Sequence, residues 1–315
     1  MTGSVLVTGA SGMLGLHVVE RLVNRGVNVV SLVNPGSPEK RPWAKEILRG
    51  TEVIEADITD RARVREALKG REFDSVIHTV AVIGGGKREY NINYRGSVNL
   101  VDSIERTGSF VYISAILALG DTLRETALEE AECRPRTWYE RSKCDAERAV
   151  KEKAAREGWR WIVLRPGWIY GKYTLNPDIP RLLRLAKHGI GIVLGGKKLK
   201  LALASADDVA NAVLHLLDRG ESGVYNVRGP RMYTSLELAE AMLKAAGRDR
   251  GGLKVTVPKI LLAPATRLIG VLRYILLAPE DVPINKLEET GWKPVIGLEE
   301  GLRTVAEWLK KWKIL

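Results

Sequence analysis

The chain has 315 residues, of which 45% are hydrophobic and 28% charged, a composition typical of a globular protein and unlike that of a disordered one. Its formal net charge is +11, but basic and acidic residues are interleaved along the predicted helices. We interpret this charge as a solvated, ion-paired surface and expect no nucleic-acid partner. The most apolar tract, residues 255–279, is interrupted by charged residues and prolines, so we expect no membrane span.

Three further features bear on the setting of the protein. The two cysteines, Cys133 and Cys144, have neither the spacing of a metal or redox motif nor the number needed for a disulfide framework, and we expect no metal site. The N-terminus runs directly into a strand pattern without a signal-peptide pattern, which favours a cytoplasmic protein. The chain contains no glutamine and is rich in Lys, Arg and Glu, a composition that favours a heat-adapted source.

Short apolar runs alternate with segments of helical periodicity in the first half of the chain. Strands are predicted at residues 4–8, 27–33, 53–55, 75–80, 110–114 and 161–164, and helices at 13–25, 42–48, 60–68, 93–106 and 138–157. Strands that are apolar on both faces and alternate with helices belong to parallel sheets that helices cover on both sides. The pattern therefore predicts a doubly wound α/β fold of the Rossmann type.

The regular alternation ends after residue 171. Helices are predicted at 179–187, 207–217, 235–246 and 298–313, with a strand at 224–227. We expect residues 1–170 and about 201–228 to form a dinucleotide-binding domain. Residues from about 171 to 200 and 229 to 315 are then expected to form a smaller, mainly helical substrate domain.

The first predicted strand is followed by a glycine-rich segment that opens a helix, Gly9-Ala10-Ser11-Gly12-Met13-Leu14-Gly15. Gly9 permits a tight turn, Gly12 lets a pyrophosphate approach the backbone, and Gly15 allows close packing of helix on strand. The free amides at the start of the helix bind phosphate oxygens. Because this loop has the required strand before it and helix after it, it predicts a dinucleotide site.

The end of the second predicted strand bears on the choice between NAD and NADP. Many NAD-binding folds carry an acidic residue there to hold the adenosine ribose, but this chain has Asn34. No carboxylate repels a 2′-phosphate, and Lys40 and Arg41 are near enough in sequence to reach one. We therefore favour NADP over NAD. NAD remains an alternative, because Lys40 and Arg41 are also typical of a solvent-exposed loop.

Tyr139 and Lys143 are four residues apart on the long predicted helix at 138–157, so they share one helical face. A tyrosine with an ordinary pKa near 10 is a weak acid–base at neutral pH, and an adjacent ammonium stabilises its phenolate. Such a tyrosine exchanges a proton with a substrate oxygen while a nicotinamide exchanges hydride. The same lysine is expected to bind the nicotinamide ribose.

Together with further segments, these motifs follow the order of one family along nearly the whole chain. The chain resembles the extended short-chain dehydrogenase/reductase family, also called the NAD-dependent epimerase/dehydratase family. The matching segments are residues 8–15 (TGASGMLG), 56–60 (ADITD), 76–81 (VIHTVA), 93–100 (NYRGSVNL), 139–143 (YERSK), 164–171 (LRPGWIYG), 207–210 (DDVA) and 224–227 (VYNV).

The resemblance implies roles for particular residues. Asp57 is expected to contact the adenine, with a helix cap as the alternative, and His78 is expected to be structural. It also implies a homodimer formed through the helices at 93–106 and 138–157. The complete set of expected cofactor contacts is Gly9, Ser11, Gly12, Met13, Leu14, Gly15, Asn34, Asp57, Ile58, Thr79, Val80, Ala81, Asn93, Tyr139, Lys143, Pro166, Trp168 and Ile169.

The chain departs from the family pattern after the fifth predicted strand, where relatives carry a Ser or Thr that binds the substrate oxygen. That position falls on Ala115, with Ser114 one residue early, and adjacent residues of a strand point to opposite faces. We take Ser114 as the provisional third catalytic residue beside Tyr139 and Lys143. Thr79 is a possible substitute and Tyr90 a less favoured one.

A second departure concerns the substrate. Relatives that act on nucleotide sugars carry an arginine for the diphosphate a few residues before the Asp208 position. Here Leu201 stands in that place, with Lys200 beside it, and Arg231 is a partial replacement at best. The apolar tract that begins at residue 255 suits either a less polar substrate or simply the core of the substrate domain.

The sequence therefore favours an NAD(P)-dependent oxidoreductase acting on a hydroxyl or keto group of a small substrate. A nucleotide-sugar 4-epimerase or dehydratase is the alternative within the same chemistry. A protein that binds the dinucleotide without turnover is the alternative of another class, and Ala115 is its only support.

Overall fold

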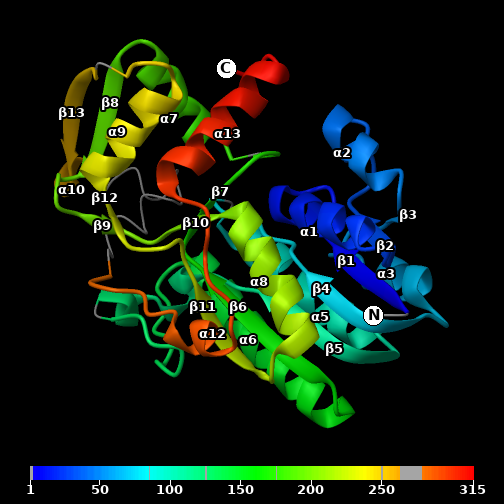
Figure 1. The fold of residues 1–315 in the computed structure, drawn as a ribbon. Helices are drawn as coiled ribbons and strands as arrows, with labels where there is room; N and C mark the ends of the chain where they lie inside the picture. The colour runs from blue at the N-terminus through cyan, green and yellow to red at the C-terminus, as the bar shows by residue number, and fades with distance from the viewer. Residues whose placement is uncertain (1–2, 85, 125, 175, 250, 263–278) are drawn as a thin grey trace.

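The computed structural model describes residues 3–84, 86–124, 126–174, 176–249, 251–262 and 279–315 (Figure 1). A seven-stranded parallel sheet forms its centre, with the strand order β11-β6-β5-β4-β1-β2-β3. Its strands are β1 (Ser4–Thr8), β2 (Asn28–Val33), β3 (Glu52–Glu55), β4 (Glu72–His78), β5 (Arg106–Ile113), β6 (Arg160–Pro166) and β11 (Gly223–Val227). The order reverses beside β1, and ligands of such sheets bind outside the strand ends at this point. The predicted Rossmann-type fold is confirmed.

Helices cover both faces of this sheet (Figure 1). One layer contains α1 (Met13–Asn24), α2 (Pro42–Leu48) and α8 (Ala206–Arg219), and the other contains α3 (Arg61–Leu68), α5 (Gly96–Ser103) and α6 (Trp138–Glu157). Each layer encloses its own hydrophobic cluster. Because both faces of β1 and β2 are buried, the sequences of these strands are mostly apolar and do not alternate.

The boundaries differ clearly from the prediction between residues 87 and 113. Where one helix was expected at 93–106, helical structure begins earlier, with a short helix α4 (Lys87–Tyr90) and a π-helical turn (Asn91–Arg95), and continues as α5. The chain has already entered β5 at Arg106. The early part of β5 is polar, which hid it from an apolar-run criterion. Its buried hydroxyl groups have hydrogen-bond partners, for example Ser75 Oγ on the neighbouring strand β4, which lies 2.8 Å from Ser109 Oγ.

The remaining elements lie beyond the end of β6. They are β7 (Trp168–Tyr170), α7 (Asp178–Lys187), β8 (Ile190–Gly195), β9 (Lys200–Leu201), β10 (Leu203–Ser205), β12 (Tyr233–Thr234), α9 (Ser235–Ala245), β13 (Leu253–Pro258), α10 (Lys259–Leu262), α12 (Asn285–Glu289) and α13 (Leu298–Lys311). Two short 3-10 helices, Ile116–Leu119 and Asp121–Arg124, follow β5.

This second part contains more strand than the sequence predicted. β8 and β13 form a parallel pair, β7 pairs with β10, and β9 pairs with β12. No strand was predicted from the sequence at β8 or β13. The apolar tract at 255–279 lies mostly outside the described residues, and the proposed domain boundaries stay a prediction. Among the helices that the structure describes, none has the length and apolar character to span a bilayer.

Candidate active site

The glycine-rich loop joins β1 to α1 as predicted. Gly9 has φ of +71°, a left-handed conformation that glycine adopts without strain. A Cβ atom on Gly15 would lie 2.2 Å from the Gly9 carbonyl oxygen, so only glycine allows the helix to pack this closely on the turn. Gly12 is the N-cap of α1 and supplies no side-chain cap, which leaves the first amides of a twelve-residue helix free for an anion.

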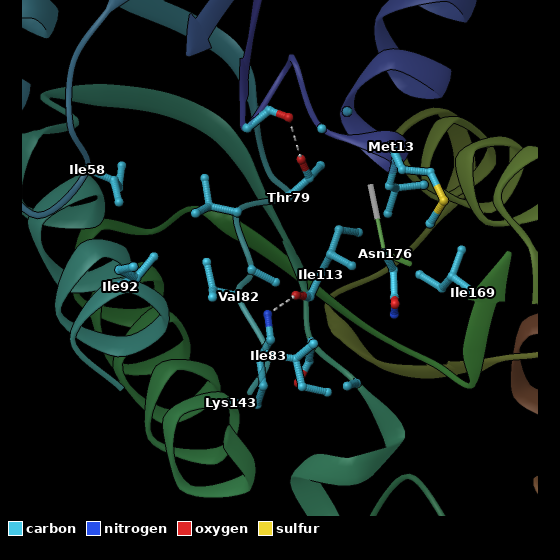
Figure 2. A pocket seen from close by; sticks show the side chains of 18 of the residues that line it. Met13, Ile58, Thr79, Val82, Ile83, Ile92, Ile113, Lys143, Ile169 and Asn176 are labelled. Atoms are coloured by element: carbon cyan, nitrogen blue, oxygen red, sulfur yellow. Dashed lines mark hydrogen bonds between the residues drawn. The ribbon is translucent and has the colours of Figure 1, made fainter. Parts of the chain in front are cut away.

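A single cavity of about 920 Å³ extends from this loop across the carboxyl ends of the strands. All but one of the predicted site residues line it, including Ser114 and the cofactor contacts from Gly9 to Ile169. Figure 2 shows Ile58 and Ile92 on one side of the cavity and Met13, Ile169 and Asn176 on the other. These residues fit a dinucleotide, because the glycine turn, the free helix amides and the Tyr139–Lys143 pair open on one space.

Asn93 is the predicted cofactor residue that does not line the cavity. Its side chain is fully buried, where Nδ2 donates to Val82 O and Oδ1 accepts from Val82 N, both at 2.8 Å. Nδ2 also lies 3.2 Å from Ser142 Oγ on α6. Asn93 therefore does not reach the cavity itself. It holds Val82, which lines the cavity, in position.

His78 lies in the core, as expected of a structural residue. Its ring bridges Thr8 Oγ1 at 2.6 Å and Ser97 Oγ at 2.9 Å, and it stacks on Tyr112. Burial and the nearby Lys143 charge lower the pKa of His78 to about 3, so the ring is neutral at physiological pH.

Asp57, Asn34 and Arg41, which the sequence analysis related to the adenosine part of a dinucleotide, all line the cavity. Asp57 accepts hydrogen bonds from the amide and hydroxyl of Thr59, while Asp60 is the residue that caps α3. Asp57 is therefore not the helix cap. Arg41 donates to Ser11 O at 2.9 Å, which ties its guanidinium to the phosphate loop, whereas Lys40 is exposed and does not line the cavity.

Tyr139 and Lys143 project from the first turns of α6 into the cavity. The helix begins with a capping box in which Thr137 and Glu140 satisfy each other's backbone amides, so the position of Tyr139 is well defined. Lys143 is almost fully buried, and its Nζ donates to Ile113 O at 2.9 Å (Figure 2). The ammonium also lies 4.9 Å from the centre of the Tyr112 ring.

The electrostatics of this pair differ from the expectation. Burial lowers the pKa of Lys143 to about 7, although the nearby Glu147 carboxylate opposes this shift. Burial and the Glu89 carboxylate raise the pKa of Tyr139 above its ordinary value. The pKa of Tyr139 is thus shifted in the direction opposite to the lowering that we expected from Lys143.

Ser114 and Ala115 follow the end of β5, and both line the cavity. The Ser114 hydroxyl donates to Glu147 Oε1 at 2.6 Å, in a buried group that also contains Arg165. Ala115 has extended backbone geometry and presents only a methyl group. The Ser114 hydroxyl is therefore engaged by Glu147, and Ala115, at the position where the family has a Ser or Thr, has no hydroxyl.

The two suggested substitutes for that hydroxyl are also engaged. Thr79 lines the cavity, but its hydroxyl donates to Thr8 O at 2.8 Å. Tyr90 lies outside the cavity and donates to Asp145 Oδ2 at 2.9 Å. Burial and the Asp145 carboxylate raise the pKa of Tyr90 to about 12, so it is a poor proton donor or acceptor at neutral pH.

The residues considered for a substrate diphosphate do not line the cavity. Leu201 is fully buried in the core. Arg231 is paired with Glu237 through Nη2 at 2.5 Å and stacks on Tyr233. Lys200 is exposed on the two-residue strand β9. The cations that do line it among the described residues are Arg41, Arg88 and Lys143.

Four polar residues of the cavity wall were not predicted from the sequence: Thr59, Arg88, Asn91 and Asn176. Asn91 begins the π-helical turn, and its side-chain oxygen is buried with no hydrogen-bond partner in the described protein. π-helical turns are common at functional sites, but such a turn has no sequence signature. Arg88 and Asn91 are three residues apart, a spacing that also occurs on any solvent-exposed helix.

Comparison with known proteins shows which family this chain and its cavity belong to. The model of the family described as "NAD dependent epimerase/dehydratase family" matches residues 5–227. A dTDP-D-glucose 4,6-dehydratase of Mus musculus is 24% identical over 98% of this chain and 88% of its own length. A 3 beta-hydroxysteroid dehydrogenase/Delta 5-->4-isomerase of Mycobacterium tuberculosis is 25% identical over 82% of this chain and 73% of its own.

The structural comparison agrees along the whole length of the fold. The crystal structure of Thermus thermophilus UDP-glucose 4-epimerase in complex with NAD superposes with a TM-score of 0.77 at 25% identity, covering 98% of this chain and 99% of that one. The resemblance predicted from the motifs is confirmed, and the matched proteins are enzymes. The chain belongs to the NAD-dependent epimerase/dehydratase family.

Proposed function

We propose that this enzyme moves hydride between a nicotinamide dinucleotide and a substrate carbon that bears a hydroxyl or keto group, with Tyr139 exchanging the proton at the substrate oxygen. The observation that carries this proposal is the shared cavity. Tyr139 and Lys143 line the same cavity as the glycine-rich loop. This cavity extends from the start of α1 to the end of β5. Hydride and proton transfer need such adjacency of cofactor and acid–base groups.

Each residue has a separate part in this scheme. The amides at the start of α1 hold the pyrophosphate, and Lys143, fixed by Ile113 O, keeps further N–H donors for the cofactor ribose. When bound, the nicotinamide ring exchanges the hydride and, in its oxidised form, brings a positive charge into the cavity. That charge favours the phenolate of Tyr139 and offsets the effects of burial and Glu89.

Because Ala115 has no hydroxyl, we expect a lower rate of turnover. We propose that Tyr139 binds the substrate oxygen without the usual Ser or Thr partner, because Ser114 Oγ is held by Glu147. The provisional role of Ser114 as an orienting donor would require this 2.6 Å bond to a buried carboxylate to break. Turnover is then slower than in a site with both hydroxyls.

For the cofactor we propose a preference for NADP within this NAD-dependent family. Arg41 lines the adenosine end of the cavity and is anchored to Ser11 O. Asn34, in the place of the usual acid, also lines the cavity and does not repel a phosphate. A fixed guanidinium beside the ribose suits a 2′-phosphate better than a free hydroxyl.

For the substrate we propose a nucleotide sugar, converted by epimerisation or dehydration. Relatives named as dTDP-glucose dehydratases and UDP-glucose epimerases support this class, and they favour it over the simple alcohol or ketone that the sequence analysis placed first. Arg88 and Asn91 provide a cation and a free acceptor on the cavity wall.

One observation favours a less polar substrate as the second candidate. The cavity wall includes apolar side chains such as Val82, Ile83 and Trp168. Leu201 is buried at the position where relatives that act on nucleotide sugars carry an arginine. One of the relatives is named as a 3 beta-hydroxysteroid dehydrogenase, and a steroid is a less polar substrate than a nucleotide sugar.

A panel assay separates these candidates. The purified chain is incubated with NAD or NADP and with UDP- and dTDP-sugars or with less polar secondary alcohols and ketones. Chromatography detects redox-neutral products, and reduced-nicotinamide absorbance detects net oxidation. Tyr139→Phe is expected to lose turnover and keep cofactor affinity, whereas Tyr90→Phe, outside the cavity, keeps both. Turnover by Tyr139→Phe at the wild-type rate contradicts the proposed chemistry.

The assembly and setting of the protein are proposals as well. We propose a homodimer that forms through the layer of α5 and α6, a cytoplasmic location and a heat-adapted source. Sedimentation of the purified chain tests the first of these, and a monomer at micromolar concentration contradicts it. A thermal unfolding midpoint in the range of mesophilic domains, about 45–65 °C, contradicts the heat-adapted source.

A further inference from the structure

Four polar residues that are almost fully buried join α6 and β6 to the end of β5, beside the cavity. Each has an exposed fraction between 1% and 3%, and they are Ser114, Lys143, Glu147 and Arg165. Ser114 and Lys143 line the cavity, whereas Glu147 and Arg165 do not. Glu147 and Arg165 therefore act on a bound ligand through other residues and not by contact.

Helix α6 binds two consecutive residues at the end of β5. Lys143 Nζ donates to Ile113 O at 2.9 Å (Figure 2). The next residue, Ser114, donates its hydroxyl to Glu147 Oε1 at 2.6 Å. Glu147 follows Lys143 by four residues on α6, so the two side chains share one face of the helix. The helix therefore holds the end of β5 at two adjacent points.

Strand β6 closes a ring of hydrogen bonds from the other side. Ser114 N donates to Leu164 O at 2.8 Å. The next residue of β6, Arg165, donates to both carboxylate oxygens of Glu147, through Nε at 2.9 Å and Nη2 at 2.7 Å. Its Nη1 donates to Glu129 O at 3.0 Å, which fixes the guanidinium itself. This two-point contact orients the Glu147 carboxylate in addition to neutralising its charge.

The ring restrains the carbonyl group to which Lys143 is bound. Ile113 O and Ser114 N belong to one planar peptide group. The carbonyl of this group accepts from Lys143 Nζ, its N–H donates to β6, and the adjoining Ser114 side chain is bound to Glu147. The orientation of the carbonyl, and with it the position of Lys143 Nζ in the cavity, therefore depends on Glu147.

We propose that Glu147 is a positioning residue, which fixes the Lys143 ammonium in the cavity through Ser114 and the Ile113 carbonyl. This inference rests on the proposed function, in which Lys143 binds the cofactor ribose. A simpler role for Glu147 is to neutralise the buried Arg165 and so stabilise the fold. The simpler role predicts that loss of Glu147 has the same effect on cofactor binding whether or not Lys143 is present.

A double-mutant cycle on cofactor affinity separates the two roles. Glu147→Gln removes the charge at nearly constant size, and Lys143→Met removes the ammonium but keeps the glycine-rich loop for binding. Both variants, their combination and the wild type are titrated calorimetrically with NAD and NADP, at a temperature where circular dichroism shows them folded. Glu147→Gln is expected to weaken binding of the tighter cofactor by about three- to thirtyfold when Lys143 is present. In the Lys143→Met background the expected loss is less than about twofold.

Glu152→Gln is the matched control, because Glu152 is exposed on the same helix, and it is expected to leave both affinities unchanged. If Glu147→Gln does not fold, Arg165→Lys takes its place in the cycle with the same expected coupling, since a lysine cannot bind both carboxylate oxygens in this way. An equal loss of affinity in both backgrounds, or no loss in the folded variant, overturns the positioning role. Wild-type affinity in Lys143→Met contradicts instead the part of Lys143 in the proposed function, and the positioning role with it.

Discussion

Ser114 donates its hydroxyl to Glu147 at 2.6 Å, while the next residue, Ala115, lines the cavity with a methyl group. The bond has a structural purpose, because Glu147 is nearly fully buried and shares its carboxylate with Arg165. A buried charge needs such partners. Ser114 thus stabilises the buried Glu147 carboxylate on α6. Ala115, at the position where the family has a Ser or Thr, offers the substrate no hydroxyl beside Tyr139.

Ala115→Ser is expected to increase turnover. The new hydroxyl stands at the family's donor position, and loss of one such donor in comparable sites costs about 10²–10³ in rate. A gain of about tenfold or more in kcat, with little change in cofactor affinity, is the expected result. Steady-state kinetics on the best substrate of the panel measure it, and an unchanged kcat shows that Tyr139 alone orients the substrate.

Ser114→Ala is the matched control for that variant. It removes a hydrogen bond to a buried carboxylate, so we expect a loss of about 1.5–3 kcal/mol in the free energy of unfolding. Because the hydroxyl is engaged by Glu147, kcat at a temperature where the variant stays folded is expected to change less than threefold. A loss of kcat of a hundredfold assigns Ser114 the catalytic role that the sequence analysis gave it.

Arg41→Ala separates the two nicotinamide cofactors. Removal of the guanidinium is expected to weaken NADP binding by about 1.5–3 kcal/mol, the range for a hydrogen bond to a charged group, and NAD binding by less. Lys40→Ala is the control, because Lys40 is exposed and outside the cavity. Calorimetric titration of each variant with each cofactor gives the comparison. An equal effect of Arg41→Ala on both cofactors contradicts the NADP preference.

The buried lysine predicts a dependence of stability on pH. The pKa of Lys143 is about 7 in the folded protein against an ordinary value of 10.5, so between these values the unfolded chain binds more protons. Stability from this group then rises with pH by up to about 1.4 kcal/mol per pH unit and is lost as pH falls toward 7. Urea unfolding at several pH values between 7 and 9 measures the slope. The slope is expected to decrease in Lys143→Met, and an identical slope in the variant refutes the assignment.

Gly15→Ala tests the close packing of α1 on the phosphate loop. The added Cβ meets the Gly9 carbonyl oxygen at 2.2 Å, where backbone must move, so we expect a loss of about 1–3 kcal/mol in stability and weaker cofactor binding. Gly297→Ala is the control, because a Cβ there meets nothing within 4 Å and φ is −71°. Denaturant unfolding and cofactor titration compare the two, and equal behaviour contradicts the packing argument.

Much of the first half was predictable because local chemistry determines it. Helices at α2 and α6 were predicted with their observed ends, since Pro42 begins one and the Thr137–Glu140 capping box begins the other. The polar start of β5 and the strands β8 and β13 were not predicted. These strands form by pairing with distant segments, which a local pattern does not contain.

The sequence by itself determined the phosphate loop, the Tyr139–Lys143 spacing and the absence of a hydroxyl at position 115, because each is a property of neighbouring residues. Only the tertiary structure decided where side chains from distant segments meet. It brought the Ser114 hydroxyl to Glu147 and the Arg41 guanidinium to Ser11, and it buried the Asn93 side chain against Val82. These contacts depend on strand order and helix packing, which bring together residues that no spacing rule relates.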